Sequence, residues 1–343
     1  MSIKIVVLPD AGAQNPFQYE MVSYLKKNGY DVVIGKKYKL GTTFKNIKIY
    51  QPAILYYDWV HSFIIGKTLL GVAFKSLIFI LELIYAKYIR RIKIVHTLHN
   101  LQNHAGLWLS LERVVYGFFL KRCNLIRVYS EEIKQEAIAK FNLPANKVLV
   151  IQDLPYHFYY PNAINREDAR KKLHIANDTF VYLFFGEIKP YKGIDNLIQA
   201  YGHVANDTNC LIIAGKGYDK NYYSQLRQMA TDIAQIQWHT RFIENDEVQL
   251  FFNAADVVVL PFTRIDHSGT IDLAMSFKKP VITLKTPATE KLLLHQTDLL
   301  FTEPTQLIAC LQKANMIDLE KIGEQNFIVA DSTNYKDITT LFS

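Results

Sequence analysis

The chain has 343 residues, half of them apolar and 21% charged, with a net charge of +7. This length suggests about two domains, and the apolar content excludes a disordered tail protein, a disulfide-stapled mini-protein and a fibrous repeat. The three cysteines, Cys123, Cys210 and Cys310, lie far apart and form no CxxC pair, which indicates a reducing compartment and no structural zinc. The opening run MSIKIVVLPDAG is too short for a signal peptide and predicts a first strand.

Positive charge is concentrated in the first half of the sequence. Residues 1–160 contain 21 Lys and Arg against 10 Asp and Glu, a balance of +11, whereas the remainder contains 18 against 22, a balance of −4. A basic half is either an ordinary solvated surface or a face that meets an anionic partner. The candidate partners are nucleic acid, a phosphorylated substrate and a membrane leaflet.

Strand-like and helix-like segments alternate along the first half. IKIVVL is typical of a buried strand because of its β-branched residues, and Phe17, Met21 and Leu25 have the spacing of a helix over residues 15–28. This alternation predicts a parallel sheet that is covered on both faces. The strands expected in this half are residues 3–8, 31–35, 53–57, 93–98, 125–130 and 147–151.

Residues 61–93 form an unusually apolar stretch. Lys67, Lys75 and Glu82 interrupt it, so that no uncharged run reaches about 18 residues and a membrane span is not expected. Two interpretations remain open: a long core helix with a basic end, and an interfacial helix that docks on anionic lipid. The charge of this half slightly favours the interfacial helix, whose basic end contains Lys87, Arg90, Arg91 and Lys93.

The second half repeats the alternation, and residues 155–170 are expected to link the two halves. Two α/β modules in tandem imply a cleft between them, and sheets of this kind bind ligands at the carboxyl ends of their strands. The expected strands are residues 179–186, 210–217, 256–262 and 279–284.

Two strand–helix loops of the second half have the composition of a phosphate site. In FFGEIKPYKG, Gly186 allows close approach of a ligand to the backbone, and Lys189 and Lys192 supply positive charge. In RIDHSGTID, Ser268 is predicted to be an N-cap, with the amides of the next two residues pointing outward toward a diphosphate. Each loop alone is also compatible with an ordinary surface loop or capped helix.

Taken in order, these segments resemble the nucleotide-binding half of GT-B glycosyltransferases of the glycosyltransferase family 4 type. The matching phrases are GEIKPYKG, AGKG, ADVVVLPF and KKPVI, and they cover about 110 residues. In the first half, HTLHNLQNH and YSEE resemble phrases of a bacterial polysaccharide subgroup, with Asn103 in place of a proline. NYKDITTLF resembles the family's last helix, in which an aromatic residue such as Tyr335 packs against the first domain.

The resemblance implies a GT-B fold, with two Rossmann-like doubly wound domains that face each other across a cleft. An N-terminal acceptor-binding domain is expected over residues 1–160, a C-terminal nucleotide-sugar-binding domain over 161–327, and a final helix over 328–343 that crosses back. The sequence departs from the family at the E-x7-E motif. Leu273 stands in place of the second Glu and Ile265 in place of the first, with Asp266 the nearest carboxylate, and Glu187 replaces a frequent Arg.

The implied reaction moves a sugar from a UDP- or GDP-linked donor to a hydroxyl of a glycan acceptor, which we expect to be lipid-linked, in polysaccharide or glycolipid synthesis. No DxD occurs in the sequence, so we expect neither metal nor other cofactor, and cationic side chains with a helix N-terminus would stabilise the leaving diphosphate. Retention is expected from the family. Inversion would require a general base, for which Asp10 is the candidate.

The site residues follow from matching the motifs position by position. The resemblance places His99 beside the donor sugar, and His96 and His104 have metal-like spacing without a complete ligand set. The catalytic candidates are His99, Asp266 and Asp10; the donor-binding candidates are Gly186, Lys189, Lys192, Phe242, Ile243, Glu244, His267, Ser268, Gly269 and Thr270; the acceptor-side candidates are Gln14, Asn15, Asn100 and His104.

Three other functions are compatible with parts of the sequence. A non-catalytic GT-B scaffold subunit would explain the missing E-x7-E pair, and a sugar-nucleotide epimerase would have a similar two-domain build. A nucleic-acid binder would use the basic half, although no recognition motif supports it. The expected location is cytoplasmic, peripheral to the inner face of the cell membrane.

Overall fold

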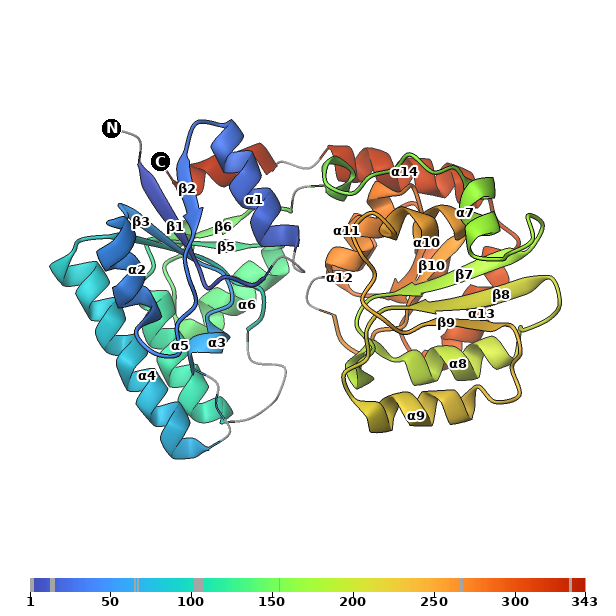
Figure 1. Cartoon of the computed structure of the whole chain (residues 1–343), viewed down its shortest axis with the longest axis horizontal. Coiled ribbons are helices and arrows are strands. Elements are labelled where there is room, and N and C mark those ends of the chain that lie inside the picture. The colour runs from blue at the N-terminus through green and yellow to red at the C-terminus, as the bar shows by residue number, and fades with distance from the viewer. Residues whose placement is uncertain are drawn as a thin grey trace. The chain divides into compact units, whose positions relative to one another are not determined.

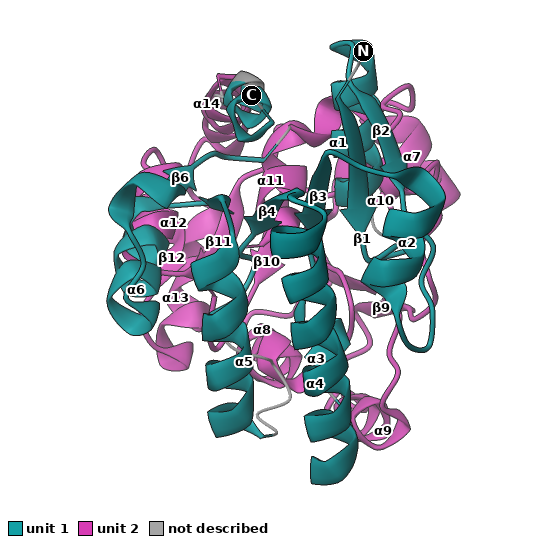
Figure 2. Ribbon diagram, turned by 90° about the vertical axis from the view of Figure 1, so that its left-hand side faces the viewer, with its two compact units in different colours: residues 1–154, 334–343 teal, residues 155–333 magenta. Residues whose placement is uncertain are grey.

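The computed structural model describes residues 3–12, 16–64, 66, 68–101, 108–153, 155–265, 268–332 and 335–342. The chain forms two compact units: unit 1 comprises residues 1–154 and 334–343, and unit 2 comprises residues 155–333 (Figure 1; Figure 2). The division after Leu154 lies a few residues before the one expected from the sequence, because Tyr156 is already tied to unit 2 by a backbone hydrogen bond to Ser276 Oγ of 2.9 Å.

Unit 1 is built on a sheet of six parallel strands in the order β2-β1-β3-β4-β5-β6. The strand order reverses between β1 and β3, where Val7 pairs with Tyr56. A point of reversal leaves the loops after both strands free to diverge, and it is the usual ligand position in such sheets. The strands are β1 (Lys4–Leu8), β2 (Asp31–Ile34), β3 (Ile54–Tyr57), β4 (Lys93–Thr97), β5 (Leu125–Val128) and β6 (Val148–Val150).

Helices cover both faces of this sheet, as the sequence predicted. Because side chains alternate along a strand, Val6 and Leu8 of β1 point into one core while Ile5 and Val7 point into the other. The helices are α1 (Pro16–Lys27), α2 (Thr42–Tyr50), α3 (His61–Ile64), α4 (Leu69–Ile84), α5 (Leu109–Arg122) and α6 (Glu131–Phe141), with a π-helical turn at Tyr85–Ile89 and a 3-10 turn at Ala145–Lys147.

Unit 2 contains a second sheet of six parallel strands, in the order β12-β11-β10-β7-β8-β9. This order is that of the dinucleotide-binding α/β fold, with the reversal between β7 and β10. Apart from the edge strand β9, its strands are nearly continuous apolar runs, as expected for a sheet buried on both faces. They are β7 (Phe180–Phe185), β8 (Asn209–Ala214), β9 (Ile236–His239), β10 (Val257–Leu260), β11 (Val281–Leu284) and β12 (Leu300–Phe301).

The helices of unit 2 also lie on both faces of its sheet (Figure 1). One core includes side chains of α7, α10, α11 and α14, and the other includes α8, α9 and α13. The helices are α7 (Arg166–Lys172), α8 (Ile194–Gly202), α9 (Lys220–Met229), α10 (Val248–Ala254), α11 (Gly269–Ser276), α12 (Pro287–Leu292), α13 (Leu307–Ala314) and α14 (Leu319–Asp331), with 3-10 turns at Tyr156–Phe158, Pro190–Lys192, Thr297–Leu299 and Pro304–Gln306.

Two expectations about the connecting segments need correction. The expected linker over residues 155–170 is part of unit 2, because α7 within it packs on α10 and Asn165 caps α7 by accepting the Asp168 N–H. The final segment is not one helix over 328–343. Helix α14 belongs to unit 2, and a separate 3-10 helix at Tyr335–Leu341 belongs to unit 1. There the Tyr335 ring meets that of Tyr24 edge-on at 4.9 Å, in the packing expected for this aromatic.

The apolar stretch of unit 1 folds into the short α3 and the long α4, which continues into the π-helical turn. Within the described residues, Leu69–Ile89 is the one segment long and apolar enough to cross a membrane, and a third of it is buried. Val72, Phe79 and Leu83 of α4 are fully buried against the sheet. Since the protein core covers this face, α4 is a layer of the α/β fold rather than an independent span.

A buried ion-pair network holds the amino end of β10 in unit 2. Asp256 Oδ2 accepts hydrogen bonds from Arg170 Nη2 at 2.8 Å and from the Val181 N–H at 2.7 Å. The Arg170 side chain is fully buried and also donates to the carbonyl of Ala254. Helix α7, strand β7 and strand β10 are therefore joined at one carboxylate.

We expect Asp256→Ala to lower the free energy of unfolding by about 3 kcal/mol, because it leaves the buried Arg170 guanidinium without its counter-charge. Urea titration followed by circular dichroism measures the change. The matched control is Glu324→Ala, which breaks the half-exposed pair with Lys278 and should cost less than about 1 kcal/mol. Equal losses in the two variants would contradict the role of the buried network.

Candidate functional site

Two loops of unit 2 meet where the strand order reverses. Gly186, which follows β7, has φ of 131°, and a Cβ atom built on it would lie 3.7 Å from Thr270 Oγ1 at the start of α11. The Thr263 N–H, after β10, donates to the carbonyl of Tyr191 at 3.3 Å. The structure therefore brings the two predicted phosphate-binding loops together at the carboxyl edge of the sheet.

The amino end of α11 lies beside the Ser268 side chain, at the carboxyl edge of the sheet. Ser268 occupies the N-cap position, but its side chain does not cap the helix, contrary to the prediction, because the Ile271 N–H bonds to the Ser268 carbonyl instead. Among the described residues, Ser268 Oγ is buried with no hydrogen-bond partner. A Cβ on Gly269 would lie 2.9 Å from the Tyr156 hydroxyl oxygen, so this position suits glycine. A helix N-terminus of this kind attracts anions.

The two loop lysines have different environments. The Lys192 ammonium lies over the Phe262 ring, 4.3 Å from its centroid, and burial lowers its pKa to about 8. Lys189 forms an ion pair with Glu187; burial opposes its charge, but the Glu187 carboxylate outweighs burial and raises the pKa of Lys189. Lys192 is therefore the charge that an incoming anion would stabilise most, since aromatic rings compensate it only weakly.

The loop that contains the donor-binding candidates Phe242, Ile243 and Glu244 follows β9. The Ile243 side chain is buried in the core of unit 2, so only its backbone is available to a ligand, whereas Glu244 is exposed. Phe242 is partly buried, and its carbonyl accepts a hydrogen bond from Arg241 at 3.1 Å. Arg241 also holds Glu247 through two bonds of 2.6 Å, which fixes this acidic loop.

In unit 1, His99 is the centre of a network at the carboxyl ends of β3, β4 and β5. Its Nε2 lies 3.1 Å from Asp58 Oδ1, and its Nδ1 lies 2.8 Å from the Tyr129 hydroxyl. The ring stacks on Trp59 with 4.6 Å between centroids, and Phe17 meets it edge-on at 5.2 Å. Both nitrogens of His99 are thus engaged, and its orientation is fixed on four sides.

Gln18 joins the loops on either side of the reversal in unit 1. Its fully buried amide nitrogen donates to the carbonyl of Pro9 and to Asp58 Oδ2, and its amide oxygen accepts the Ala11 N–H. Asp10 faces inward in the same loop, where its Oδ1 accepts the Gly12 N–H at 2.8 Å and the Tyr19 hydroxyl at 3.1 Å. These two bonds make Asp10 a structural part of the loop after β1.

Of the remaining residues named from the sequence, Asn100 and His96 are described by the structure and five others are not. The carbonyl of Asn100 lies 3.4 Å from His61 Nε2, beside the His99 network. His96 is fully buried, with its ring nitrogens 2.8 Å from the Tyr57 carbonyl and from the Tyr116 hydroxyl, and burial lowers its pKa. The candidates that lie outside the described residues are Gln14, Asn15, His104, Asp266 and His267.

The sequence prediction missed the partners of His99. Asp58 and Trp59 directly follow the predicted strand over residues 53–57, and Tyr129 directly follows β5, although the predicted strand ran on to residue 130. The residues after a strand are where parallel sheets carry functional side chains. That position was a usable signal for Asp58, which is almost fully buried. No local pattern indicated Gln18, whose role depends on two loops far apart in the sequence.

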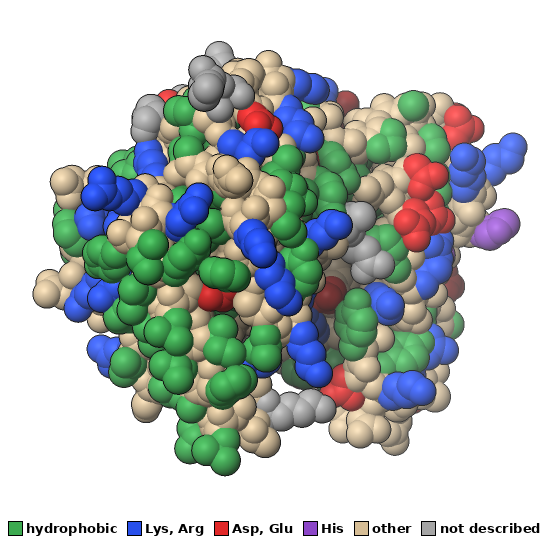
Figure 3. Space-filling model, turned by 60° about the vertical axis from the view of Figure 1, so that its left-hand side comes forward, with side chains coloured by type: hydrophobic (Ala, Val, Ile, Leu, Met, Phe, Trp, Pro, Cys, Tyr) green, Lys and Arg blue, Asp and Glu red, His purple; other side chains and the backbone are tan. Residues whose placement is uncertain are grey.

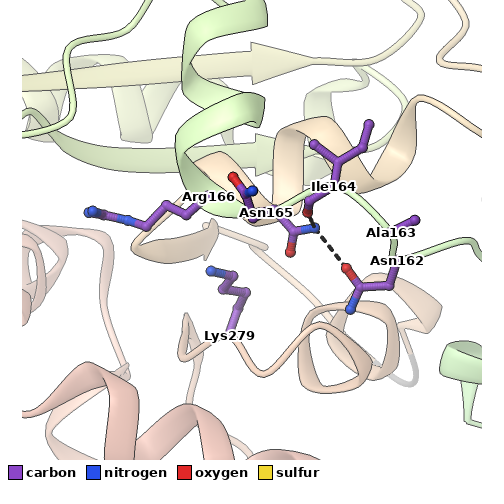
Figure 4. A pocket seen from close by; sticks show the side chains of 7 residues that line it. Asn162, Ala163, Ile164, Asn165, Arg166 and Lys279 are labelled. Carbon is purple, nitrogen blue, oxygen red and sulfur yellow. Dashed lines mark hydrogen bonds between the residues drawn. The ribbon is translucent and has the colours of Figure 1, made fainter.

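A separate cavity of about 350 Å³ lies at the opposite edge of the unit 2 sheet (Figure 4). Lys279 lines it just before β11, where its ammonium donates to the carbonyl of Ala255 at 2.8 Å and burial lowers its pKa to about 8. Asn253 donates to Asn162 Oδ1 across another wall of this cavity. The cavity is at the amino ends of the strands and is distinct from the loops of Gly186 and Ser268.

Burial of Lys192 has a measurable consequence for stability. Its folded pKa of about 8 lies below the ordinary value of 10.5, so the unfolded chain binds more protons above pH 8 and stability rises with pH. We expect the free energy of unfolding to increase between pH 7 and 9.5 by about 2 kcal/mol more in the unaltered chain than in Lys192→Met. Lys279 affects both proteins alike and cancels in this difference. Exposed Lys171→Met is the control and should follow the unaltered chain; a parallel pH dependence in Lys192→Met would contradict burial of this charge.

Solved structures share the fold along the whole chain. HepE from Anabaena, in complex with UDP and glucose, is 16% identical, with a TM-score of 0.75 over 99% of both chains. Sucrose-phosphate synthase from Thermosynechococcus elongatus is 14% identical, with a TM-score of 0.76 over 100% of this chain and 97% of that chain. Both comparisons establish the GT-B fold, with its two parallel α/β sheets, as predicted.

Curated relatives match parts of the sequence. An uncharacterized glycosyltransferase of Methanocaldococcus jannaschii is 24% identical over 64% of this chain and 58% of its own length. A GDP-mannose:glycolipid 4-beta-D-mannosyltransferase of Xanthomonas campestris is 29% identical over 29% of each chain. The chain thus spans less than two thirds of either relative.

The family model described as glycosyl transferases group 1 matches residues 165–317, most of unit 2. Residues 165–317 are therefore similar to the group 1 glycosyl transferases, within a chain that has the GT-B fold.

Proposed function

We propose that the chain transfers a sugar from a nucleotide diphosphate-sugar to a hydroxyl of a lipid-linked glycan, without a metal ion. The observation that carries this proposal is the amino end of α11. There the buried Ser268 Oγ has no hydrogen-bond partner among the described residues, and the helix begins against Gly186 and beside the loop of Lys192. Such a site fits a diphosphate, the leaving group of the reaction.

The chemistry requires stabilisation of negative charge as the sugar–phosphate bond breaks. The first amides of α11 and the Ser268 hydroxyl would hydrogen-bond the β-phosphate, and the Lys192 ammonium would neutralise it. Lys192 is held over the Phe262 ring before any ligand binds, so little reorganisation is needed. The adjacent Lys189–Glu187 pair would keep the second lysine charged and near the same loop.

His99 would position the donor sugar rather than abstract a proton. Both of its ring nitrogens are engaged by Asp58 and Tyr129, so use as a base would break a part-buried hydrogen bond. Oδ1 of Asp10 is likewise held by its own loop. A retaining transfer, which needs no protein base on the acceptor hydroxyl, agrees with these structural roles.

The names of similar proteins support the substrate classes. HepE was solved with UDP and glucose, and the Xanthomonas enzyme is named for GDP-mannose and a glycolipid. UDP and GDP are therefore the nucleotides to test. A lipid-linked acceptor also agrees with the strongly basic first half of the chain.

Helix α4 would bring the chain to the membrane where such an acceptor resides. Leu70, Phe74, Leu77 and Leu81 follow helical spacing on its outer face, and more than half of each side chain is exposed. Figure 3 shows hydrophobic side chains gathered over this face of unit 1, with Lys and Arg side chains around them. An apolar stripe with a basic border is typical of a helix that lies in the membrane interface.

A non-catalytic scaffold subunit is the second candidate, because the E-x7-E pair is missing. Leu273, at the position of the second Glu, is buried in the core of unit 2 and offers no polar group. A scaffold of this kind would bind no nucleotide-sugar productively, so nucleotide binding followed by turnover separates the two proposals.

We expect UDP or GDP to bind at micromolar concentration in a calorimeter with chelator present, and Lys192→Ala to weaken that binding at least about tenfold through loss of a charge-assisted contact. Bound diphosphate should also return a proton to Lys192, so that binding above pH 8 takes up protons from the buffer. Lys171→Ala, on α7, is the control for removal of a positive charge. Absence of binding to either nucleotide would reject the donor site and favour the scaffold.

We expect Leu77→Ser and Leu81→Ser each to weaken sedimentation with phosphatidylglycerol vesicles about tenfold, because each removes an apolar side chain from the inserted face. Ile328→Ser, an equally exposed apolar residue of unit 2, is the control and should leave sedimentation unchanged. Binding that depends on Ile328 as much as on the leucines would rule out α4 as the membrane face.

A further inference from the structure

A cavity of about 360 Å³ opens in unit 1 beside the exposed face of α4. The loop between β2 and α2 forms one wall, and α3 and α4 form the others. Pro9, which follows β1, contributes to the floor, so the cavity lies at the carboxyl edge of the sheet. Three lysines line it together with a largely apolar wall; the lysines are Lys37, Lys39 and Lys75, and the apolar residues include Phe63, Ile78 and Phe79.

The charge of this region is one-sided. Lys37 and Lys39 are exposed on the loop, and Lys75 extends from α4 toward the same cavity. The one carboxylate in the lining, Glu82, is committed elsewhere: its Oε1 accepts the Phe44 N–H at 2.8 Å in the first turn of α2, and burial raises its pKa. Three ammonium groups around one cavity favour an anionic ligand with several oxygens, such as a phosphate.

The apolar wall of the cavity is continuous with the membrane-facing stripe. Ile78 and Phe79 line the cavity from α4, while Leu77 and Leu81 of the same turns are exposed outside it. Phe44, on α2, lies against Tyr85 at 5.1 Å and extends the exposed apolar area past the end of α4. A ligand with a phosphate in the cavity therefore has an apolar path along which a hydrocarbon chain can leave.

Charge complementarity distinguishes this ligand from a second copy of the chain. In the sequence, residues 36–50 and 69–93 contain ten Lys and Arg and a single acidic residue, the buried Glu82. Two such faces would repel each other across a dimer interface, whereas an anionic membrane attracts both the stripe and its border.

We propose that this cavity binds the phosphate that joins the glycan acceptor to its lipid, with the lipid chain lying along the outer face of α4. The inference rests on the proposed function, because it identifies the acceptor of that reaction as a phospholipid-linked sugar. Lys37, Lys39 and Lys75 form the headgroup site, and the stripe from Leu70 to Leu81 holds the chain in the membrane.

The test uses the full chain and vesicles that differ only in headgroup. Phosphatidic acid presents a phosphomonoester, and phosphatidylserine vesicles are adjusted to the same zeta potential. We expect about tenfold tighter binding to phosphatidic acid, the discrimination that one charge-assisted hydrogen bond supplies. The triple variant Lys37→Ala, Lys39→Ala, Lys75→Ala should lose this preference.

Two variants separate recognition of the phosphate in the cavity from the general attraction of basic side chains to an anionic vesicle. The triple variant Lys36→Ala, Lys48→Ala, Arg90→Ala removes the same charge from exposed positions outside the cavity. It should weaken binding to both kinds of vesicle about fivefold for each charge removed, and it should keep the preference for phosphatidic acid. Ser62→Trp narrows the cavity without changing charge, and it should lose the preference while phosphatidylserine binding stays the same. Absence of a preference in the unaltered chain, or its loss in the outer triple variant, would overturn the proposal.

Two further arms identify the source of the phosphate. Inorganic pyrophosphate and glycerol 3-phosphate should compete with phosphatidic acid vesicles only at concentrations at least a hundredfold above that of the lipid, since they lack the chain; equal competition would assign the cavity to a free phosphate compound. Nucleotide binding measured on the cavity triple variant should equal that of the unaltered chain. A chain that prefers phosphatidic acid but binds no nucleotide would reject the proposed reaction and leave the phospholipid site standing.

Discussion

The donor-side loops of unit 2 take their shape from glycines at which one backbone segment passes directly against another. A Cβ on Gly215 would lie 1.8 Å from the carbonyl oxygen of Gly186, and a Cβ on Gly193 would lie 2.0 Å from that of Pro261. Only glycine permits these approaches. Gly186, Gly193 and Gly215 all have positive φ, which excludes most other residues as well. The loops after β7, β8 and β10 can therefore pack peptide against peptide. That packing sets Gly186 against Thr270 in the first turn of α11 and places Lys192 over Phe262, so the proposed anion site depends on it.

In unit 2, the strands that were predicted are those whose apolar runs are buried on both faces. Strands β9 and β12 were missed, and both are edge strands of unit 2: β9 reads IQWH, half polar, and β12 has two residues. An edge strand meets one neighbour and need not be continuously apolar, so its sequence signal is weak. The donor loops could be predicted because their glycines, lysines and helix start are local features. The Asp58–His99 contact joins residues 41 positions apart, and Ser268 looked like a cap although the backbone closes that turn.

One buried guanidinium fixes both points at which the chain leaves and re-enters unit 1. Arg127 is fully buried, pairs with Asp153 just before the chain enters unit 2, and donates to the carbonyl of Ile151. The Tyr335 ring, just after the chain returns, lies 5.8 Å from the same guanidinium. Burial, and then the negative charge of Asp153, raise the pKa of the neighbouring Glu20 to about 9, so this carboxyl is protonated at neutral pH and adds no second negative charge. The connections are thus anchored at one end by a charge that solvent does not screen.

Discontinuity of unit 1 in the sequence has a consequence for biosynthesis. The six strands of its sheet are all complete by Val150, but one of its two cores includes Tyr335, Ile338, Leu341 and Phe342, which are translated after the whole of unit 2. Since domains fold as units when their residues emerge from the ribosome, unit 2 can finish folding first, while unit 1 waits with an open apolar face beneath α1. During that interval the nascent chain exposes two apolar surfaces, which are the incomplete core of unit 1 and the outer side of α4. Docking of the final residues completes this core and ends the exposure of its apolar face.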